Sequence, residues 1–226
     1  MSFNEMNNNK VYITGEVVSQ IVFSHEIYGE RFYEFNLKVD RLSSSYDIIP
    51  VTITERLLTE NSINLGSKFS AIGQFRSYNK LDEGKSKLML TVYIKEILPY
   101  NELENPNYIE ITGFVCKEPI FRVTPFKREI TDVLLAVNRS YNKSDYLPCI
   151  AWGKNARLIK NFVVGDKVQV IGRIQSREYQ KKLDDGTVVT KTAYEVSLSK
   201  IVLYNDEIDT IDIEKYMPLS NIVYGV

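Results

Sequence analysis

The sequence is poor in the residues that build metal sites and disulfide frameworks. Its 226 residues include one histidine and two cysteines, too few for a clustered zinc site or a disulfide scaffold. Cys116 and Cys149 lie in apolar, strand-like stretches, so we expect buried free thiols in a reducing compartment. His25 lies in a polar segment, where a surface histidine is a better interpretation than a catalytic one.

Long apolar runs and catalytic motifs are missing as well. No stretch approaches the roughly 20 apolar residues of a membrane span, and the polar first nine residues do not resemble a signal peptide. We therefore expect a cytoplasmic protein without a membrane partner. Neither a P-loop nor a zinc-protease motif occurs, since Gly153-Lys154-Asn155 lacks the upstream glycine and the hydroxyl that a P-loop needs. The sequence predicts no enzyme, no metal and no cofactor.

The chain does contain a long internal repeat. Asn9 to Gly15 (NKVYITG) returns as Asn107 to Gly113 (NYIEITG) at an offset of 98 residues, and later segments match at an offset of 99. An offset that grows only in turns indicates a duplicated domain, because solenoid repeats are about 20–50 residues long. We predict domains at residues 1–104 and 105–205, and an acidic tail at 206–226.

Charge is distributed unevenly between the two copies. Residues 107–204 carry 16 Lys and Arg against 10 Asp and Glu, a net charge of +6. Residues 1–106 have a net charge of −3, and residues 205–226 a net charge of −4. The second copy is therefore the candidate for binding a polyanion, although lysines scattered over a surface would give the same count.

Hydrophobic periodicity predicts the fold class. Apolar residues alternate with polar ones, as at Phe35, Leu37 and Val39, which is typical of half-buried strands. Five strands with a helix between the third and fourth form the oligonucleotide/oligosaccharide-binding (OB) barrel. We predict an all-β protein of two tandem OB-fold barrels, with the first copy's helix near 54–63. In the second copy we expect strands at 108–117, 130–139 and 146–152, a helix at 154–163, and a hairpin of 167–180 with 187–204.

Aromatic residues lie among cations in the second copy. This mixture suits single-stranded nucleic acid, because base faces stack on aromatic rings while Lys and Arg contact phosphates. Each aromatic taken alone is as readily a packing residue of a strand. The candidate stacking residues are Tyr141, Tyr146, Trp152 and Tyr179, and the candidate phosphate contacts are Arg139, Lys143, Lys154, Arg173, Arg177, Lys181 and Lys182.

Two segments of the second copy carry a family resemblance. They are DYLPCIAWGKNA from Asp145 to Ala156, and VGDKVQVIGRIQSREY from Val164 to Tyr179. Together they resemble bacterial single-stranded DNA-binding protein, in which an aromatic-Gly-Lys strand end precedes a short helix and a glycine-containing strand. The tandem arrangement is similar to clostridial members with two such domains. The resemblance covers about residues 107–204, and it implies that the four candidate aromatics are the family's stacking positions.

The resemblance also implies a function. It implies sequence-independent binding of single-stranded DNA in replication, repair or recombination, with replication or repair proteins open as partners. Family members usually join four OB-folds, which two chains would supply as a homodimer. Two alternatives stay open: a primosome-type protein-interaction module, and a binder of single-stranded RNA, since no residue pattern reports on a 2′-hydroxyl.

The first copy departs from the family pattern. At the four stacking positions it has Ser43, Ile48, Thr54 and Lys80. We therefore expect an assembly module or a weaker extension of the binding groove. The tyrosines of the first copy leave two interpretations open: packing within strands, or a different binding surface. They are Tyr28, Tyr33 and Tyr78.

The tail at 206–226 is short and ends without an acidic tip, so recruitment of partners through it stays open.

Overall fold

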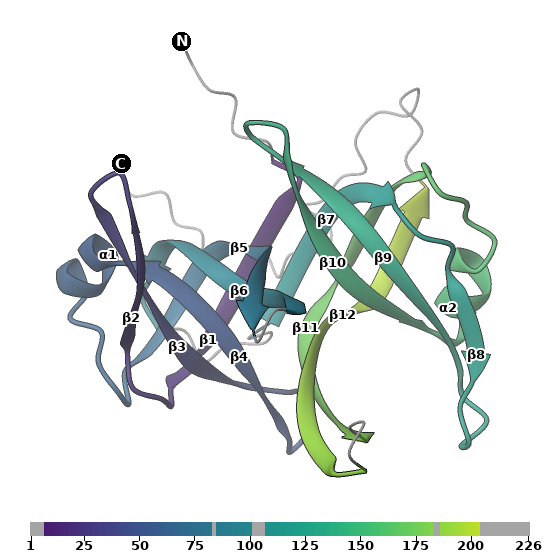
Figure 1. Cartoon of the computed structure of the whole chain (residues 1–226), viewed down its shortest axis with the longest axis horizontal. Helices are drawn as coiled ribbons and strands as arrows, with labels where there is room; N and C mark the ends of the chain where they lie inside the picture. The colour runs from purple at the N-terminus through teal and green to yellow at the C-terminus, as the bar shows by residue number, and fades with distance from the viewer. Residues whose placement is uncertain (1–6, 83–84, 101–106, 183–185, 204–226) are drawn as a thin grey trace.

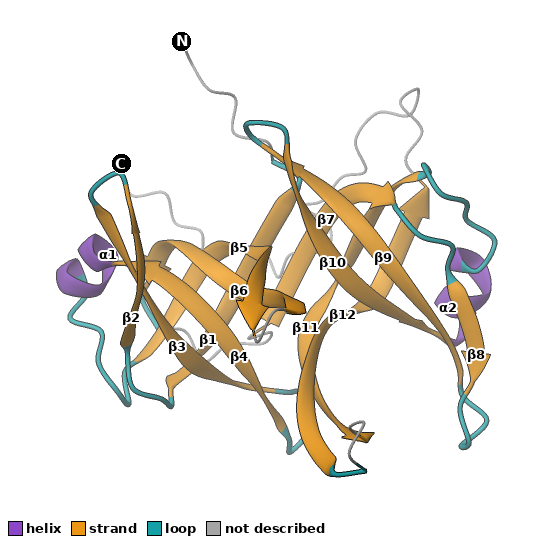
Figure 2. Cartoon of the chain, in the orientation of Figure 1, coloured by secondary structure: helices purple, strands orange, loops and turns teal. Residues whose placement is uncertain are grey.

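The computed structural model describes residues 7–82, 85–100, 107–182 and 186–203. Within these ranges the chain forms twelve strands and two short helices, which confirms the all-β class (Figure 1). The helices lie at the two outer ends of the molecule (Figure 2). No helix in the described ranges has the length and apolarity to span a membrane. The domain limits predicted near residues 104 and 205, and the tail, fall outside these ranges, so that division stays a prediction.

The first copy closes into a five-membered ring of strands. Its pairings run β1–β3–β4–β6–β5 and return to β1, and only the β4–β6 pairing is parallel. This closure is the OB barrel, in which a helix follows the third ring strand. The elements are β1 (Asn9–Val17), β2 (Val22–Ile27), β3 (Glu30–Asp40), β4 (Tyr46–Thr54), α1 (Glu55–Glu60), β5 (Lys68–Asp82) and β6 (Lys85–Leu98).

The second copy closes in the same way. Its ring runs β7–β9–β10–β12–β11 and back to β7, with β10–β12 as the parallel pairing. The β11–β12 hairpin projects beyond its barrel (Figure 1). The elements are β7 (Asn107–Val115), β8 (Ile120–Val123), β9 (Glu129–Arg139), β10 (Lys143–Trp152), α2 (Gly153–Ile159), β11 (Lys167–Lys182) and β12 (Val188–Leu203).

The structure differs from the prediction in the number of strands and in the limits of the helices. Each copy has a sixth strand, β2 or β8, which pairs only with the outer part of β3 or β9. All four residues of β8 are exposed, so this strand lacks the alternation of buried and exposed residues by which a strand is predicted. Helix α2 ends at Ile159 rather than at residue 163, and α1 at Glu60 rather than near residue 63. After α2 the Phe162 N–H donates to the Ile159 carbonyl, three residues back, and the Asp166 N–H donates to the Val163 carbonyl, so the chain continues in turns.

Both barrels have a glycine where the long hairpin bends. The pairing register shifts between Ile72 and Gly73, and again between Ile171 and Gly172. A Cβ atom at Gly73 would lie 2.4 Å from the Tyr93 carbonyl oxygen, and one at Gly172 2.2 Å from the Ser197 carbonyl oxygen. Only glycine lets the neighbouring strand approach this closely, which explains why the repeat retains it.

The two barrels join edge to edge. Strands β1 and β7 pair antiparallel, with Val11 opposite Ile109, so all twelve strands form one continuous sheet. Carboxylates from both sides reinforce the junction. The main-chain N–H of Ser176 donates to Asp47 Oδ1 over 2.7 Å, and that of Ser77 donates to Asp145 Oδ1 over 2.6 Å. Each barrel therefore holds the other through equivalent residues, in a pseudo-twofold arrangement.

Candidate nucleic-acid interface

Strand register defines one outer face on the second barrel. Residues directly opposite each other on paired strands point to the same side of a sheet. Arg173 lies opposite Ser197, Gln175 opposite Glu195, and Tyr179 opposite Lys191 on β11 and β12. Because Ile150 of β10 lies opposite Ser197, the alternating residues of β10 belong to this side. The second-barrel face therefore includes Tyr146, Ile150, Trp152, Arg173, Gln175, Arg177, Tyr179, Lys191, Glu195 and Ser197.

The four predicted stacking residues are all exposed. Tyr146 and Trp152 lie at the two ends of β10 on the second-barrel face and have exposed fractions of 46% and 38%. Tyr179 is 38% exposed on the projecting hairpin. Tyr141 lies in the β9–β10 turn at a positive φ of 63° and is 80% exposed. Exposed rings are what base stacking requires, and packing within strands would have buried them.

Six of the seven predicted cations divide into two groups, and the seventh, Arg177, belongs to a polar cluster. Lys143, Lys154, Lys181 and Lys182 are exposed. Two arginines instead reach the carboxylates of the junction: Arg173 Nη1 lies 3.5 Å from Asp47 Oδ2, and Arg139 Nη1 lies 3.4 Å from Asp145 Oδ1. Since both guanidinium groups remain partly exposed, they fix the junction and still present charge to the surface.

A polar cluster that the sequence did not predict lies in the middle of the second-barrel face. Gln175 Nε2 donates to Glu195 Oε1 over 2.8 Å, and Arg177 Nε lies 3.6 Å from the same oxygen. Arg177 also lies over the Tyr179 ring, with its guanidinium carbon 5.9 Å from the centroid. The cluster holds the arginine and the tyrosine side by side, so a phosphate contact and a stacking ring are presented together.

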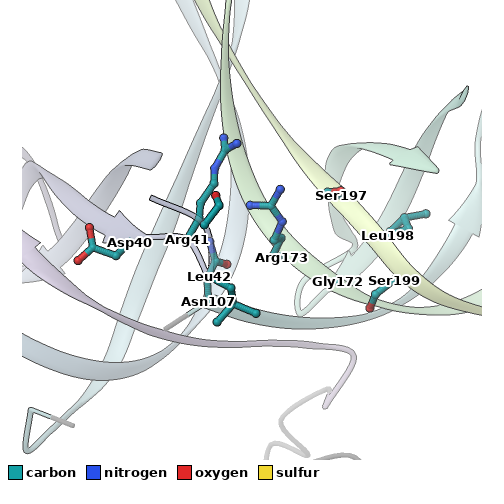
Figure 3. A pocket seen from close by; sticks show the side chains of 10 residues that line it. Asp40, Arg41, Leu42, Asn107, Gly172, Arg173, Ser197, Leu198 and Ser199 are labelled. Atoms are coloured by element: carbon teal, nitrogen blue, oxygen red, sulfur yellow. The ribbon is translucent and has the colours of Figure 1, made fainter. Parts of the chain in front are cut away.

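A pocket of about 360 Å³ lies where this face meets the first barrel (Figure 3). Arg41 and Arg173 point into it from the two barrels, and both pair with the buried Asp47. Each barrel therefore contributes one guanidinium group to this pocket. The lining residues are Asp40, Arg41, Leu42, Ser43, Asn107, Gly172, Arg173, Ser197, Leu198 and Ser199.

The junction carboxylates have opposite pKa shifts. Burial alone would raise the pKa of Asp47, but the two hydrogen bonds from Arg41 and one from the Ser176 N–H lower it below its usual value. Burial raises the pKa of Asp145, which the more distant Arg139 does not offset. Asp145 Oδ2 is also buried without a hydrogen-bond partner among the described residues. The Asp47 side of the junction is therefore the stronger one.

The first barrel uses the equivalent positions differently. Thr54, which corresponds to Trp152, caps helix α1 by accepting a hydrogen bond from the Leu57 N–H over 3.3 Å. Trp152 is the N-cap residue of α2 and makes no such bond. A capping hydroxyl contributes about 1 kcal/mol to helix stability. The second barrel lacks this contribution and has an exposed aromatic ring in its place.

The fold and this face define a class: tandem OB-fold proteins with an exposed aromatic and cationic surface. A solved structure of the single-stranded DNA-binding protein from Thermus aquaticus aligns over 92% of this chain and 98% of its own, with a TM-score of 0.69 and 17% identity. At this identity the likeness establishes the fold. It extends over both barrels.

Sequence comparison relates the second barrel to a known family. Residues 106–204 match the model of the single-strand binding protein family. The chain is 34% identical over 88 residues to a single-stranded DNA-binding protein of Clostridium tetani, and 29% identical over 96 residues to single-stranded DNA-binding protein A of Bacillus subtilis. These matches cover 36% and 39% of this chain, and 59% and 56% of the two relatives. The predicted resemblance is confirmed for the second barrel, and the chain spans less than two thirds of the length of these relatives.

Proposed function

We propose that the chain binds single-stranded DNA without preference for sequence, and without catalysing a reaction. The observation that carries this proposal is the second-barrel face, on which exposed aromatic rings lie beside cations. Bases would stack on Tyr146, Trp152 and Tyr179, while arginines and lysines of the same barrel contact phosphates. Because every base has a stacking face, such binding tolerates any sequence, which suits proteins of replication, repair and recombination.

The single tryptophan allows a direct test. Trp152 fluorescence should be quenched by oligo(dT), because a base stacked on the indole alters its emission. Trp152→Ala should weaken binding by about 1–3 kcal/mol, a range taken from single-strand-binding proteins of this kind rather than from this chain. Binding by the variants is followed by the anisotropy of a labelled oligonucleotide. Trp152→Phe is the matched control and should retain most of the affinity. Unchanged emission at saturating oligo(dT) would refute the assignment.

Salt and competitor nucleic acids test the rest of the proposal. The logarithm of the association constant should fall linearly with that of the salt concentration, since phosphate contacts release counterions. Duplex DNA should compete poorly, because its bases are not free to stack. Equal affinity for oligo(rU) and oligo(dT) would favour the RNA-binding alternative, and salt-independent binding would argue against phosphate contacts.

The oligomeric state, the cellular location and the protein partners of the chain are further proposals. Each chain joins its two barrels through β1 and β7, so a homodimer would contain the four OB-folds that are usual in this family. Sedimentation equilibrium should then give twice the chain mass of 26.1 kDa. A cytoplasmic location suits a DNA-binding role. Replication or repair proteins stay open as partners, and so does the primosome-type alternative.

A further inference from the structure

The first barrel also has an aromatic and cationic outer face, at positions other than the family's. The register that defines the second-barrel face applies here too: Gln74 lies opposite Tyr93, Arg76 opposite Thr91, and Lys80 opposite Lys87. Phe32 and Glu34 of β3 complete this side, since Glu34 lies opposite Thr52, which in turn lies opposite Tyr93. The first-barrel face therefore includes Phe32, Glu34, Thr52, Gln74, Arg76, Tyr78, Lys80, Lys87, Thr91 and Tyr93.

Four side chains of this region form a continuous series of ring contacts. The exposed His25 ring stacks parallel to Phe32, with centroids 4.8 Å apart and an interplanar angle of 11°. Phe32 meets Tyr93 at 6.2 Å and a tilt of 41°, and the Arg76 guanidinium lies 3.9 Å from the centroid of the Tyr93 ring. This aromatic ladder offers a flat imidazole at one end and a guanidinium plane at the other. Nucleobases stack on both kinds of group.

Tyr78 adds an oriented ring to the ladder. It is 39% exposed, and its hydroxyl lies 3.3 Å from Glu34 Oε1. Glu34 also accepts a hydrogen bond from Ser24, so the acid on this face already has two partners. Burial and the Glu34 carboxylate raise the pKa of Tyr78 to about 12, which keeps the phenol neutral. A fixed, neutral ring suits stacking better than a mobile one.

The cations of the hairpin favour an anionic ligand. Lys80 and Lys87 lie directly opposite each other on β5 and β6, and like charges in that arrangement destabilise a sheet. An anion between them would relieve the repulsion. The net charge of −3 over residues 1–106 therefore does not describe this face, where Arg76 and both lysines gather.

The junction brings the first-barrel face close to the second barrel's own stacking residues. The Tyr146 main-chain N–H donates to Ser77 Oγ over 2.8 Å, and Ser77 lies between Arg76 and Tyr78 on β5. Ser43, the equivalent of Tyr141, lines one pocket with Arg173 and Ser197 of the other barrel. From the pseudo-twofold relation we expect Tyr141 on the side of Gln74 and Tyr93. A single strand of DNA that passes Tyr141 and Tyr146 would reach the first-barrel face next.

We propose that the first barrel is a second binding site for single-stranded nucleic acid, with Arg76, Tyr78 and Tyr93 in place of the missing family aromatics. The ligand class rests on the proposed function. The site itself rests on residues that the second barrel does not share: Gln175, Arg177 and Ser197 occupy the equivalent positions there. One DNA strand would then run continuously over both barrels.

The test uses the full chain and two lengths of oligo(dT). An OB-fold covers about 4–16 nucleotides, so about 10 nucleotides fit one barrel and about 35 reach both. The variant carries Arg76→Ala and Tyr78→Ala. Its matched control carries Lys68→Ala and Tyr100→Ala, which removes another exposed cation–tyrosine pair (5.7 Å) from the far end of β5.

The variant should bind the long oligonucleotide about 5- to 100-fold more weakly than the unchanged chain, and the short one equally well with full quenching of Trp152. The control should match the unchanged chain for both lengths. Equal affinity of the variant for the long oligonucleotide would overturn the proposal. Absence of Trp152 quenching by the short oligonucleotide would instead count against the proposed function of the second barrel.

Photo-cross-linking provides a readout that needs no variant. A long oligonucleotide containing 5-iodouracil should cross-link to Tyr78 or Tyr93, as well as to the second barrel, when the products are mapped by mass spectrometry. Cross-links confined to residues 107–203 would overturn the proposal, and would leave the first-barrel face to a protein partner.

Discussion

Corresponding positions of the two barrels show what a duplicated frame leaves free to vary. At the end of the third ring strand, the first barrel has Thr54, which caps its helix, and the second has the exposed Trp152. At the bend of the long hairpin both have glycine, because no Cβ fits there. Positions that close the barrel are therefore shared. Positions on the outer face have diverged, and the role of each barrel has to be inferred from them.

The largest difference between the barrels is expected in how much stability each junction carboxylate contributes. Asp47→Asn removes the carboxylate that Arg41 binds through two hydrogen bonds and Arg173 approaches. Breaking such a buried pair should lower the free energy of unfolding by about 3 kcal/mol. Asp145→Asn should cost less than about 1 kcal/mol, because an amide oxygen can still accept the hydrogen bond from the Ser77 N–H. Among the described residues, Asp145 also has no hydrogen-bonded arginine like Arg41, and its Oδ2 is without a hydrogen-bond partner. Urea denaturation measures both, and equal losses would contradict the ranking.

A smaller contrast is expected between the two helix starts. Trp152→Ala should weaken oligo(dT) binding by about 2 kcal/mol, in line with the general range for a stacked base. Thr54→Ala should leave binding unchanged and lower the free energy of unfolding by about 1 kcal/mol, because α1 loses its cap. Anisotropy and urea denaturation of both variants separate the two roles. A loss of affinity in Thr54→Ala would show that this position also contacts DNA.

The smallest contrast is expected in how the stability contributed by Asp47 and Asp145 depends on pH. The lowered pKa of Asp47 gives stability that is present above about pH 4, the unfolded value, and is lost as pH falls through the folded pKa. The raised pKa of Asp145 has the opposite sign: the folded state takes up its proton first, so stability increases as pH falls through that pKa towards 4. Asp47→Asn should therefore flatten the acid limb of a stability–pH curve, and Asp145→Asn the limb above pH 4.

The sequence predicted the ring of strands and the family resemblance of the second barrel because both depend on local patterns. Alternation in segments such as Phe35 to Val39 reflects burial on one side of a strand, and the Trp152-Gly153-Lys154 signature is contiguous. The short strands β2 and β8 lack buried alternation and were missed. Their positions depend on pairing with β3 and β9, which no local pattern reports.

The candidate site was predicted in part. The four aromatics are exposed as expected, and their contacts with DNA stay a prediction. The Gln175–Glu195 cluster depends on register across a hairpin, and the Asp47–Ser176 contact joins residues 129 apart. A signal for the junction was nevertheless present, because Asp47 and Asp145 occupy equivalent places in the repeat. Two copies that keep a buried acid in the same position indicate a shared structural role.

The pairing of β1 with β7 has a consequence for how such a protein diverges. Two separate chains associate according to their concentration, and identical chains present identical halves. Here the partner barrel is part of the same polypeptide, so its local concentration is in the millimolar range whatever the dilution. A substitution on one barrel is not imposed on the other. An acidic barrel can therefore accompany a basic one in a fixed one-to-one ratio, and a strand crossing between them meets the two surfaces side by side.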